Sequence, residues 1–249
     1  VWYTGVIRHA TSQYNTPSIV KGKAGSPYAI TDYYDIDPDI CEDKRRRMHE
    51  FEELVERSHQ AKLDVIIDFV PNHVAREYHS TCKPKGVEDL GATDNPQWAF
   101  SPLNNFYYIH QPFAPSFDVE GYTENPTRAT GNDCFTAHPS KDDWYETVKL
   151  NYGVFYQGSG EQQFDPIPNT WHKMLHILLF WSNKGVDGFR CDMAEMVPQA
   201  FWAWVIPQVK AKYPNILFIA EVYNPNLYRE YLAAGFDYLY DKVGMYDYL

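Results

Sequence analysis

Three strand-like segments end in side chains that could perform acid–base or nucleophilic chemistry. In the first, residues 185–192 (GVDGFRCD), an apolar and aromatic run leads into Arg190 and Asp192. Alternate residues of a strand share a face, so these two side chains point the same way. The guanidinium would keep the carboxylate ionised and oriented, as a carboxylate nucleophile requires. A simple strand-end ion pair would have the same sequence, so the other two segments decide between these interpretations.

The second and third segments also carry their polar residues at one end. Residues 63–73 (LDVIIDFVPNH) place Asp68, Asn72 and His73 after a near-continuous apolar run, and residues 215–222 (NILFIAEV) place Glu221 after Ile219 and Ala220. This apolar setting would favour a protonated Glu221, which suits a general acid. Together the three ends predict a polar site containing a nucleophile and an acid.

The intervening segments predict the elements that position these side chains. Helical periodicity covers residues 43–62, with Asp43 as N-cap, and 170–184, 198–213 and 225–234, the last stopped by Gly235. Asp192 and Glu221 stand 29 positions apart, close to one βαβ step of about 30 residues. Alternating strands and helices with polar strand ends predict an α/β fold, a partial (β/α)8 TIM barrel covering about strands 2 to 6.

Two regions depart from this alternation. Residues 25–40 (GSPYAITDYYDIDPDI) are punctuated by Pro and Asp, which predicts an ordered loop exposing Tyr28, Tyr33 and Tyr34. Residues 74–151 lack an amphipathic helix of useful length and predict a loop-rich domain inserted after barrel strand 3. The expected organisation is therefore barrel (1–73), insertion (74–151) and barrel (152–249).

Composition narrows the class of function. The chain has 249 residues, 44% of them hydrophobic, and a net charge of −11, which argues against a nucleic-acid surface. No apolar run approaches the length of a membrane span. Twenty Tyr and seven Trp offer many rings on which sugars could stack, although core packing is the commoner use of each. A soluble enzyme acting on a neutral substrate fits these properties; the oligomeric state is left open.

The four cysteines have no metal-binding spacing. Cys191 lies within a predicted strand and should be buried and unpaired. Cys82 and Cys134 fall in the loop-rich region and could form a disulfide in an exported protein. No thiolate metal site is expected.

The strand-end motifs resemble those of the α-amylase family of retaining glycoside hydrolases, glycoside hydrolase family 13. Residues 68–73 (DFVPNH) are similar to its first signature, 188–192 (GFRCD) to its second, and 220–221 (AE) to its third. The resemblance implies that Asp192 is the nucleophile, Glu221 the general acid/base and Arg190 the residue that orients Asp192. It also implies that His73 and Tyr28 contact the sugar, with Asp68 and Asn72 in the same substrate-binding region.

Two departures from the family's motifs bear on ligands. Glu195-Met196 replaces the Lys-His that commonly follows the nucleophile, so contacts to the leaving side of the sugar are not carried over. Lys149, in VKLNYG, stands where an Asp often binds calcium, and Met196 replaces a second expected ligand. Asn72 remains, but an ammonium makes a poor cation site. No cofactor is expected to be required, and a structural Ca²⁺ would lack part of its usual ligands.

The resemblance implies hydrolysis of α-1,4-glucosidic bonds in starch-like oligo- or polysaccharides. A cyclomaltodextrinase, a neopullulanase or a transglycosylase of the same family would share every motif quoted. A non-catalytic glycan-binding barrel is a further alternative, disfavoured because both Asp192 and Glu221 are present. A metal-dependent barrel hydrolase is disfavoured because Asp68, Asn72 and His73 do not form a tight ligand set.

The family's fourth signature, an Asn-His-Asp run that supplies a third catalytic carboxylate, has no counterpart after Asp241. An eight-stranded barrel with an insertion also needs more residues than this chain offers. We therefore expect the natural protein to continue on both sides.

Overall fold

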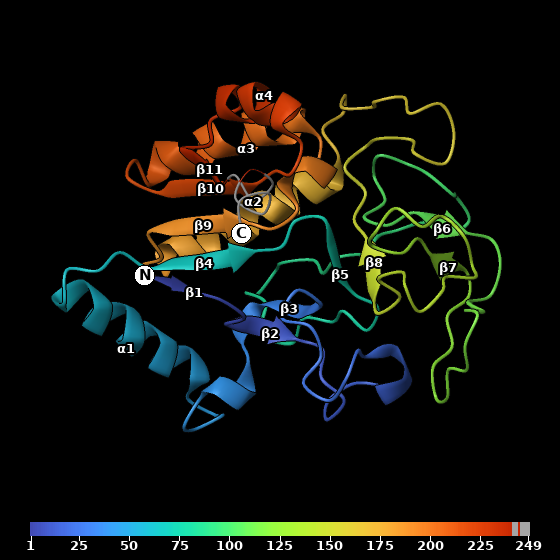
Figure 1. Cartoon of the computed structure of the whole chain (residues 1–249), viewed down its shortest axis with the longest axis horizontal. Helices are drawn as coiled ribbons and strands as arrows, with labels where there is room; N and C mark the ends of the chain where they lie inside the picture. The colour runs from blue at the N-terminus through green and yellow to red at the C-terminus, as the bar shows by residue number, and fades with distance from the viewer. Residues whose placement is uncertain (241–243, 245–249) are drawn as a thin grey trace. The chain divides into compact units, whose positions relative to one another are not determined.

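A computed structural model of the chain describes residues 1–240 and Gly244. Its main sheet has five strands, all parallel, in the order β1-β4-β9-β10-β11 (Figure 1). These strands are β1 (Trp2–Tyr3), β4 (Ile66–Phe69), β9 (Gly188–Cys191), β10 (Leu217–Glu221) and β11 (Tyr238–Tyr240). The predicted strands that end near Asp68, Asp192 and Glu221 are thus β4, β9 and β10, three neighbours in one sheet.

Aromatic packing consolidates the centre of the sheet. The Phe189 ring of β9 lies 6.1 Å from Phe69 on β4 and 5.7 Å from Phe218 on β10, centroid to centroid, and all three side chains are fully buried. Trp202 of helix α3 packs edge-on against Phe69 at 6.4 Å. Parallel strands that are covered by helices carry such continuous apolar residues, which is why their sequences lacked alternation.

Residues 1–240 contain four α-helices: α1 (Arg47–Gln60), α2 (Asn169–Asn183), α3 (Gln199–Lys212) and α4 (Tyr228–Ala233). Short 3₁₀ turns are η1 (Pro17–Ile19), η2 (Pro38–Ile40), η3 (Ala194–Met196) and η4 (Pro225–Leu227). Pro207 lies inside α3, and Gly235, with φ at +113°, follows α4 as predicted. In the part of the chain that the structure describes, no helix is long and apolar enough to cross a membrane.

The prediction that Asp43 caps the first helix is wrong. Helix α1 begins at Arg47, and the Asp43 carboxylate instead accepts the backbone N–H of Arg45 at 2.9 Å. Glu50, in the first turn of α1, accepts the N–H groups of Glu42 and Asp43 at 2.8 Å each. The Asp43 and Glu50 carboxylates therefore stabilise a separate turn before the helix, and the helix begins about one turn later than predicted.

The predicted loop over residues 25–40 is also wrong, because Ile30–Ile36 form strand β3, in which every residue is buried. Tyr33 and Tyr34 are buried rather than exposed, and Tyr28 is half-buried. Asp32, which suggested a turn, is a strand residue whose carboxylate accepts the N–H groups of Thr81 and Cys82. Hydrogen bonds from residues distant in sequence therefore satisfy the Asp32 carboxylate, although its sequence neighbours predicted a turn.

The chain forms two compact units. Unit 1 contains residues 1–6, 36–72 and 174–249, and unit 2 contains 7–35 and 73–173. The predicted domain division at 73/74 and 151/152 remains a prediction. In the structure, residues 7–35 belong to unit 2. No disulfide joins the four cysteines, all of which lie in the described part of the chain, and Cys191 is buried as expected.

Unit 2 is built on short two-stranded sheets. They pair β2 (Ile7–His9) with β3, β5 (His73–Ala75) with β8 (Thr147–Lys149), and β6 (Tyr108–Ile109) with β7 (Thr127–Arg128). Residues 74–151, all within the described part of the chain, contain no helix, in agreement with their sequence.

Candidate active site

Arg190 is the centre of a buried charge cluster in unit 1. Its Nη1 donates to Asp192 Oδ1 at 2.7 Å and to Asp68 Oδ1 at 3.2 Å, and its Nη2 lies 2.8 Å from Glu221 Oε2. Side-chain exposure is only 6–8% for all four residues. The parallel pairing of β4, β9 and β10 explains the convergence, because Asp68 and Arg190 are register partners and β10 is the next strand.

Two residues outside the predicted set complete the surroundings of the guanidinium. The Tyr240 hydroxyl accepts from Nε at 3.1 Å and also from Nη2, and the Trp2 ring centroid lies 5.4 Å from the guanidinium carbon. Thr4 Oγ1 donates to Asp68 Oδ2 at 2.6 Å. The planar fork of Arg190 is thus engaged along its whole edge, which fixes its orientation.

Glu221 receives further donors at the end of β10. Its Oε2 accepts the backbone N–H of Met193 at 2.9 Å, and its Oε1 accepts the Tyr223 hydroxyl at 2.9 Å. Met193 has a left-handed backbone, with φ at +45°, which is uncommon for a residue other than glycine. This turn directs a backbone donor at a carboxylate from the next strand.

One guanidinium faces three buried carboxylates, so their protonation is linked. Burial raises the pKa of Asp192 to about 7; Arg190 opposes this shift, and the nearby charge of Glu221 adds to it. Burial would also raise the pKa of Glu221, but the Met193 N–H, the Tyr240 hydroxyl and Arg190 outweigh it and lower that pKa. Of the two carboxyl groups, Asp192 therefore has the stronger tendency to be protonated in this structure.

The directions of these pKa shifts differ from the expectation drawn from the sequence, which had Asp192 ionised and Glu221 protonated. Local sequence identified Arg190 beside Asp192 and an apolar run before Glu221. It did not reveal that Glu221 collects donors from three other segments. Arg190 contacts both carboxyl groups, so protonation of one changes the proton affinity of the other.

The remaining predicted site residues are placed as follows. Asn72 belongs to unit 1 and is fully buried beyond the end of β4. Tyr28 and His73 belong to unit 2, where the His73 ring bonds to the Tyr28 backbone and lies 5.2 Å from the Trp144 ring. Burial, followed by the charge of Lys149, lowers the pKa of His73 to about 3. His73 is therefore a neutral imidazole, suited to bonding with a hydroxyl group.

Lys149 occupies the position where the resemblance would place a calcium ligand. Its ammonium is buried and lies 2.7 Å from Asp133 Oδ1, with the Tyr156 ring centroid at 5.5 Å. A fixed positive charge already neutralises the acidic group on that side. The residues present do not fit a cation at this position.

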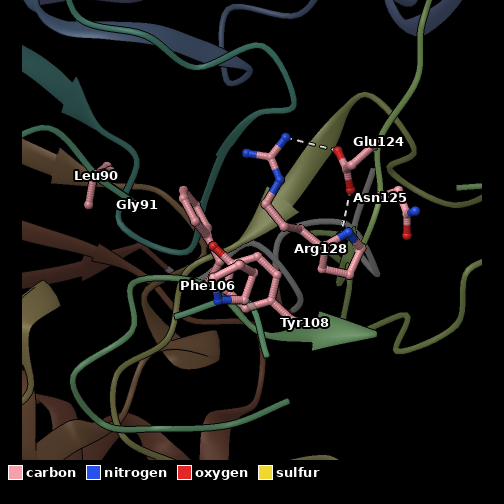
Figure 2. A pocket seen from close by; sticks show the side chains of 9 residues that line it. Leu90, Gly91, Phe106, Tyr108, Glu124, Asn125 and Arg128 are labelled. Carbon is pink, nitrogen blue, oxygen red and sulfur yellow. Dashed lines mark hydrogen bonds and ion pairs between the residues drawn. The ribbon is translucent and has the colours of Figure 1, made fainter. Parts of the chain in front are cut away.

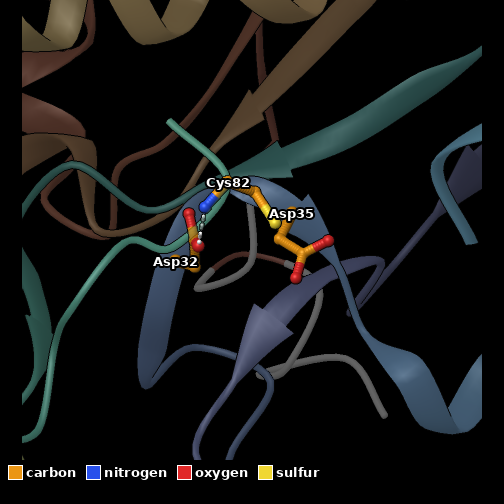
Figure 3. Close-up of side chains that lie close together, drawn as sticks. All are labelled: Asp32, Asp35 and Cys82. Atoms are coloured by element: carbon orange, nitrogen blue, oxygen red, sulfur yellow. Dashed lines mark hydrogen bonds between the residues drawn. The ribbon is translucent and has the colours of Figure 1, made fainter. Parts of the chain in front are cut away.

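Asp32, Asp35 and Cys82 form a group whose potential ligand atoms lie within 4.8 Å of one another (Figure 3). Asp32 already accepts hydrogen bonds from the 80–82 segment, and Asp35 pairs with Arg8 at 3.2 Å. These partners account for the buried carboxylates without an ion. The group is best explained as a structural link between β3 and the segment that follows Arg76.

A hollow of about 360 Å³ lies in unit 2 (Figure 2). It is lined by Leu90, Gly91, Pro96, Phe106, Tyr108, Glu124, Asn125, Pro126 and Arg128. Arg128 pairs with Glu124 at 2.8 Å, and the Phe106 and Tyr108 side chains are buried at 3% and 8% exposure. The charges are therefore compensated and the ring faces are covered, so this hollow offers less chemistry than the Arg190 cluster.

Sequence reasoning missed Tyr223, Tyr240 and Glu195. Tyr223 stands two residues after Glu221, where strand alternation would place it on the same face, and Tyr240 ends the next apolar strand. These are the same signals that identified Asp192. A tyrosine hydroxyl at a strand end suggests catalytic chemistry less strongly than a charged group does. Glu195 does not lie at the end of a predicted strand, so no such pattern pointed to it.

The chain is similar to several known proteins. Residues 9–231 match the family described as alpha amylase, catalytic domain. The chain is 26% identical over 237 residues to an alpha-1,4-glucan:maltose-1-phosphate maltosyltransferase of Cereibacter sphaeroides, covering 90% of this chain and 31% of that enzyme. It is also 26% identical over 229 residues to Alpha-amylase 3 of Dictyoglomus thermophilum, covering 87% and 38% respectively.

Among solved structures, an alpha-amylase from Lactobacillus plantarum superposes with a TM-score of 0.61 at 27% identity, over 99% of this chain and 46% of that one. The chain thus spans less than half the length of each of these relatives. Because the match extends through most of the sequence, including all three strand-end motifs, the chain belongs to the α-amylase family, glycoside hydrolase family 13.

Proposed function

We propose that this chain supplies the catalytic carboxylates of an enzyme that hydrolyses α-1,4-glucosidic bonds in α-glucans with retention of configuration. The observation that carries the proposal is the Arg190 cluster, in which Asp192 and Glu221 from neighbouring parallel strands share one guanidinium. A retaining glycosidase needs one carboxylate nucleophile and one carboxylic acid close together. Asp192 is proposed as the nucleophile and Glu221 as the acid/base.

These roles require the balance of protonation to change when substrate binds. The pKa of Asp192 is raised and that of Glu221 is lowered in the structure without substrate, whereas Glu221 must be protonated when the glycosidic oxygen arrives. An electron-poor anomeric carbon beside Asp192 would favour its ionised form, and a sugar that excludes water from Glu221 would favour the protonated acid.

Family membership supports the remaining assignments. Family members typically need no cofactor, and some contain structural calcium. Tyr28 and His73 are proposed to contact the sugar, with Asn72 and Asp68 supporting the same region, on the strength of their motif positions. The five-stranded parallel sheet is proposed to be part of a (β/α) barrel comprising residues 1–73 and 152–249, and residues 74–151 an inserted domain.

A transglycosylase is the second candidate, because one relative is named as a maltosyltransferase that uses maltose-1-phosphate. Hydrolysis and transfer share the glycosyl-enzyme intermediate and differ in whether water or a sugar hydroxyl attacks it. Product analysis at high acceptor concentration separates them: longer glucans indicate transfer, and reducing sugars alone indicate hydrolysis.

The experiment for the acid role compares Glu221→Gln with wild type in the full-length protein. A glucan needs a proton on its leaving oxygen, whereas an α-glycosyl fluoride departs without one. We expect the variant to lose at least about 100-fold in kcat/KM on glucan and far less on the fluoride. Equal losses would assign the acid role elsewhere.

The experiment for the nucleophile uses a fluorinated glycosyl fluoride that reacts quickly and hydrolyses slowly, so that the glycosyl-enzyme accumulates. Peptide mapping by mass spectrometry should place the sugar on Asp192. A sugar on Glu221 would show that the two carboxylates have exchanged roles, an outcome that the order of their pKa values makes worth testing.

A further inference from the structure

Two hydrogen bonds from different segments hold the two oxygens of the Glu221 carboxylate. Oε2 accepts the Met193 N–H, and Oε1 accepts the Tyr223 hydroxyl, each at 2.9 Å. Tyr223 is half-buried and follows β10 by two residues. Its hydroxyl can donate to an ionised carboxylate and can accept from a protonated one, so it can stay bonded in either state.

Glu195 holds the backbone that carries Tyr223. Its Oε2 accepts the N–H of Tyr223 at 3.1 Å and the N–H of Asn224 at 3.0 Å. Glu195 lies in η3, directly after the left-handed Met193. The same turn therefore bonds to Glu221 through the Met193 amide and to the Tyr223 segment through the Glu195 carboxylate.

We propose that Glu195 and Tyr223 are positioning residues for the acid/base Glu221: Glu195 fixes the 222–224 segment, and Tyr223 fixes Oε1 of Glu221. This inference rests on the proposed function. It assigns a structural role to the position where the family commonly has a Lys, using contacts that involve only residues of unit 1.

The chemical consequence concerns the moment at which Glu221 gives up its proton. A negative charge develops on its carboxylate as the leaving oxygen is protonated, and the Tyr223 hydroxyl donates to that charge. A hydrogen bond to a charged group changes a rate by about 10- to 100-fold. Substrates that leave without a proton do not need this contact.

Several groups besides Tyr223 face Glu221 and set its titration. Arg190 and Asp192 reach it from β9 and the turn after it, and Tyr240 reaches it from β11. A Tyr223→Phe variant leaves these groups in place and removes one donor to the charged form. The pKa of Glu221 should therefore rise, and the limb of the kcat/KM profile that Glu221 controls should move to higher pH.

The test uses the full-length protein and two substrates with one glycone, an aryl α-maltoside with a poor leaving group and α-maltosyl fluoride. Tyr223→Phe should lose about 10- to 100-fold in kcat/KM on the aryl maltoside and less than about 3-fold on the fluoride. Glu195→Ala should show the same selectivity. Glu195→Gln should retain most activity, because its amide oxygen can still accept both N–H groups. Exposed Tyr238→Phe is the matched control.

Equal losses on both substrates, or wild-type kcat/KM on both together with an unshifted pH profile, would overturn the inference. If Tyr223→Phe lowers the melting temperature, the kcat/KM values of Glu195→Ala and Glu195→Gln on the two substrates test the same inference while Tyr223 stays intact. A wild-type protein that cleaves neither substrate would refute the proposed function itself, and the inference with it. These results are therefore distinguishable.

Discussion

Arg190 Nη1 lies 2.7 Å from Oδ1 of Asp192, two residues further along the chain, although β9 ends between them at Cys191. The contact confirms that both side chains lie on one face at the strand end, as strand alternation predicts. It also shows that the partner which orients Asp192 comes from the adjacent part of the same strand. Orientation of this carboxylate therefore depends little on loop conformation.

The first prediction concerns Asp192→Asn. The change removes a charge and almost no volume, and the amide oxygen can still accept from Arg190, so the fold should persist. Hydrolysis of an α-glucan by the full-length variant should fall below detection, because an amide cannot form the glycosyl-enzyme. The release of reducing sugar from starch measures this.

The control for this prediction is wild-type protein prepared in parallel, with circular dichroism used to compare the two folds. A folded Asp192→Asn variant with normal turnover would show that Asp192 is not the nucleophile. Slow activity that grows on storage would indicate deamidation back to Asp, which mass spectrometry would detect.

The fold was predictable where apolar runs are continuous. β4, β9 and β10 could be predicted from the sequence because both faces of each strand are buried or half-buried, which leaves polar residues only at the ends. β3 was missed because Asp32 and Asp35 resemble turn residues, and the hydrogen bonds that satisfy Asp32 come from residues 80–82. Local sequence carries no information about such a distant partner.

The charged residues of the site could be predicted from the sequence, but their protonation states could not. Arg190, Asp192, Glu221 and Asp68 converge because each ends or follows a parallel strand. The order of the two pKa values depends on how many donors reach Glu221, and those donors lie on β11, the β9 turn and the end of β10. The number of these donors cannot be predicted from the spacing of residues along the chain.

The second prediction concerns Arg190→Ala. This change leaves Asp68, Asp192 and Glu221 buried without their cation, and removing one partner of a buried ion pair typically costs about 3–5 kcal/mol of stability. The free energy of unfolding at pH 7, from urea titration, should fall by that amount. Because protonation neutralises the stranded carboxylates, the difference from wild type should shrink as the pH falls to 4.

Exposed Arg229→Ala supplies the matched control and should change stability by less than about 0.5 kcal/mol. A loss for Arg190→Ala that is equally large at pH 4 and pH 7 would indicate lost packing against Trp2 and Tyr240 instead of uncompensated charge.

The third prediction is that no calcium binds beside Asn72. The buried Lys149 ammonium faces Asp133 in unit 2, and Met196 replaces a second ligand that the family resemblance would supply. A crystal structure grown with millimolar calcium chloride tests this directly. Oxygen ligands at about 2.3–2.6 Å around an ion next to Asn72 would contradict the prediction.

The fourth prediction concerns stability against pH. The folded-state pKa of Asp192, about 7, exceeds the ordinary value of 3.8, so the folded protein binds this proton more tightly than the unfolded chain does. The resulting stabilisation is complete below about pH 4 and is lost as the pH rises towards 7.

Asp192→Asn cannot ionise and removes this dependence. The difference in unfolding free energy, variant minus wild type, should therefore become more positive between about pH 4 and pH 7 and level off at higher pH. Urea titrations at several pH values measure it, and a difference that does not vary with pH would show that Asp192 has an ordinary pKa in the folded protein.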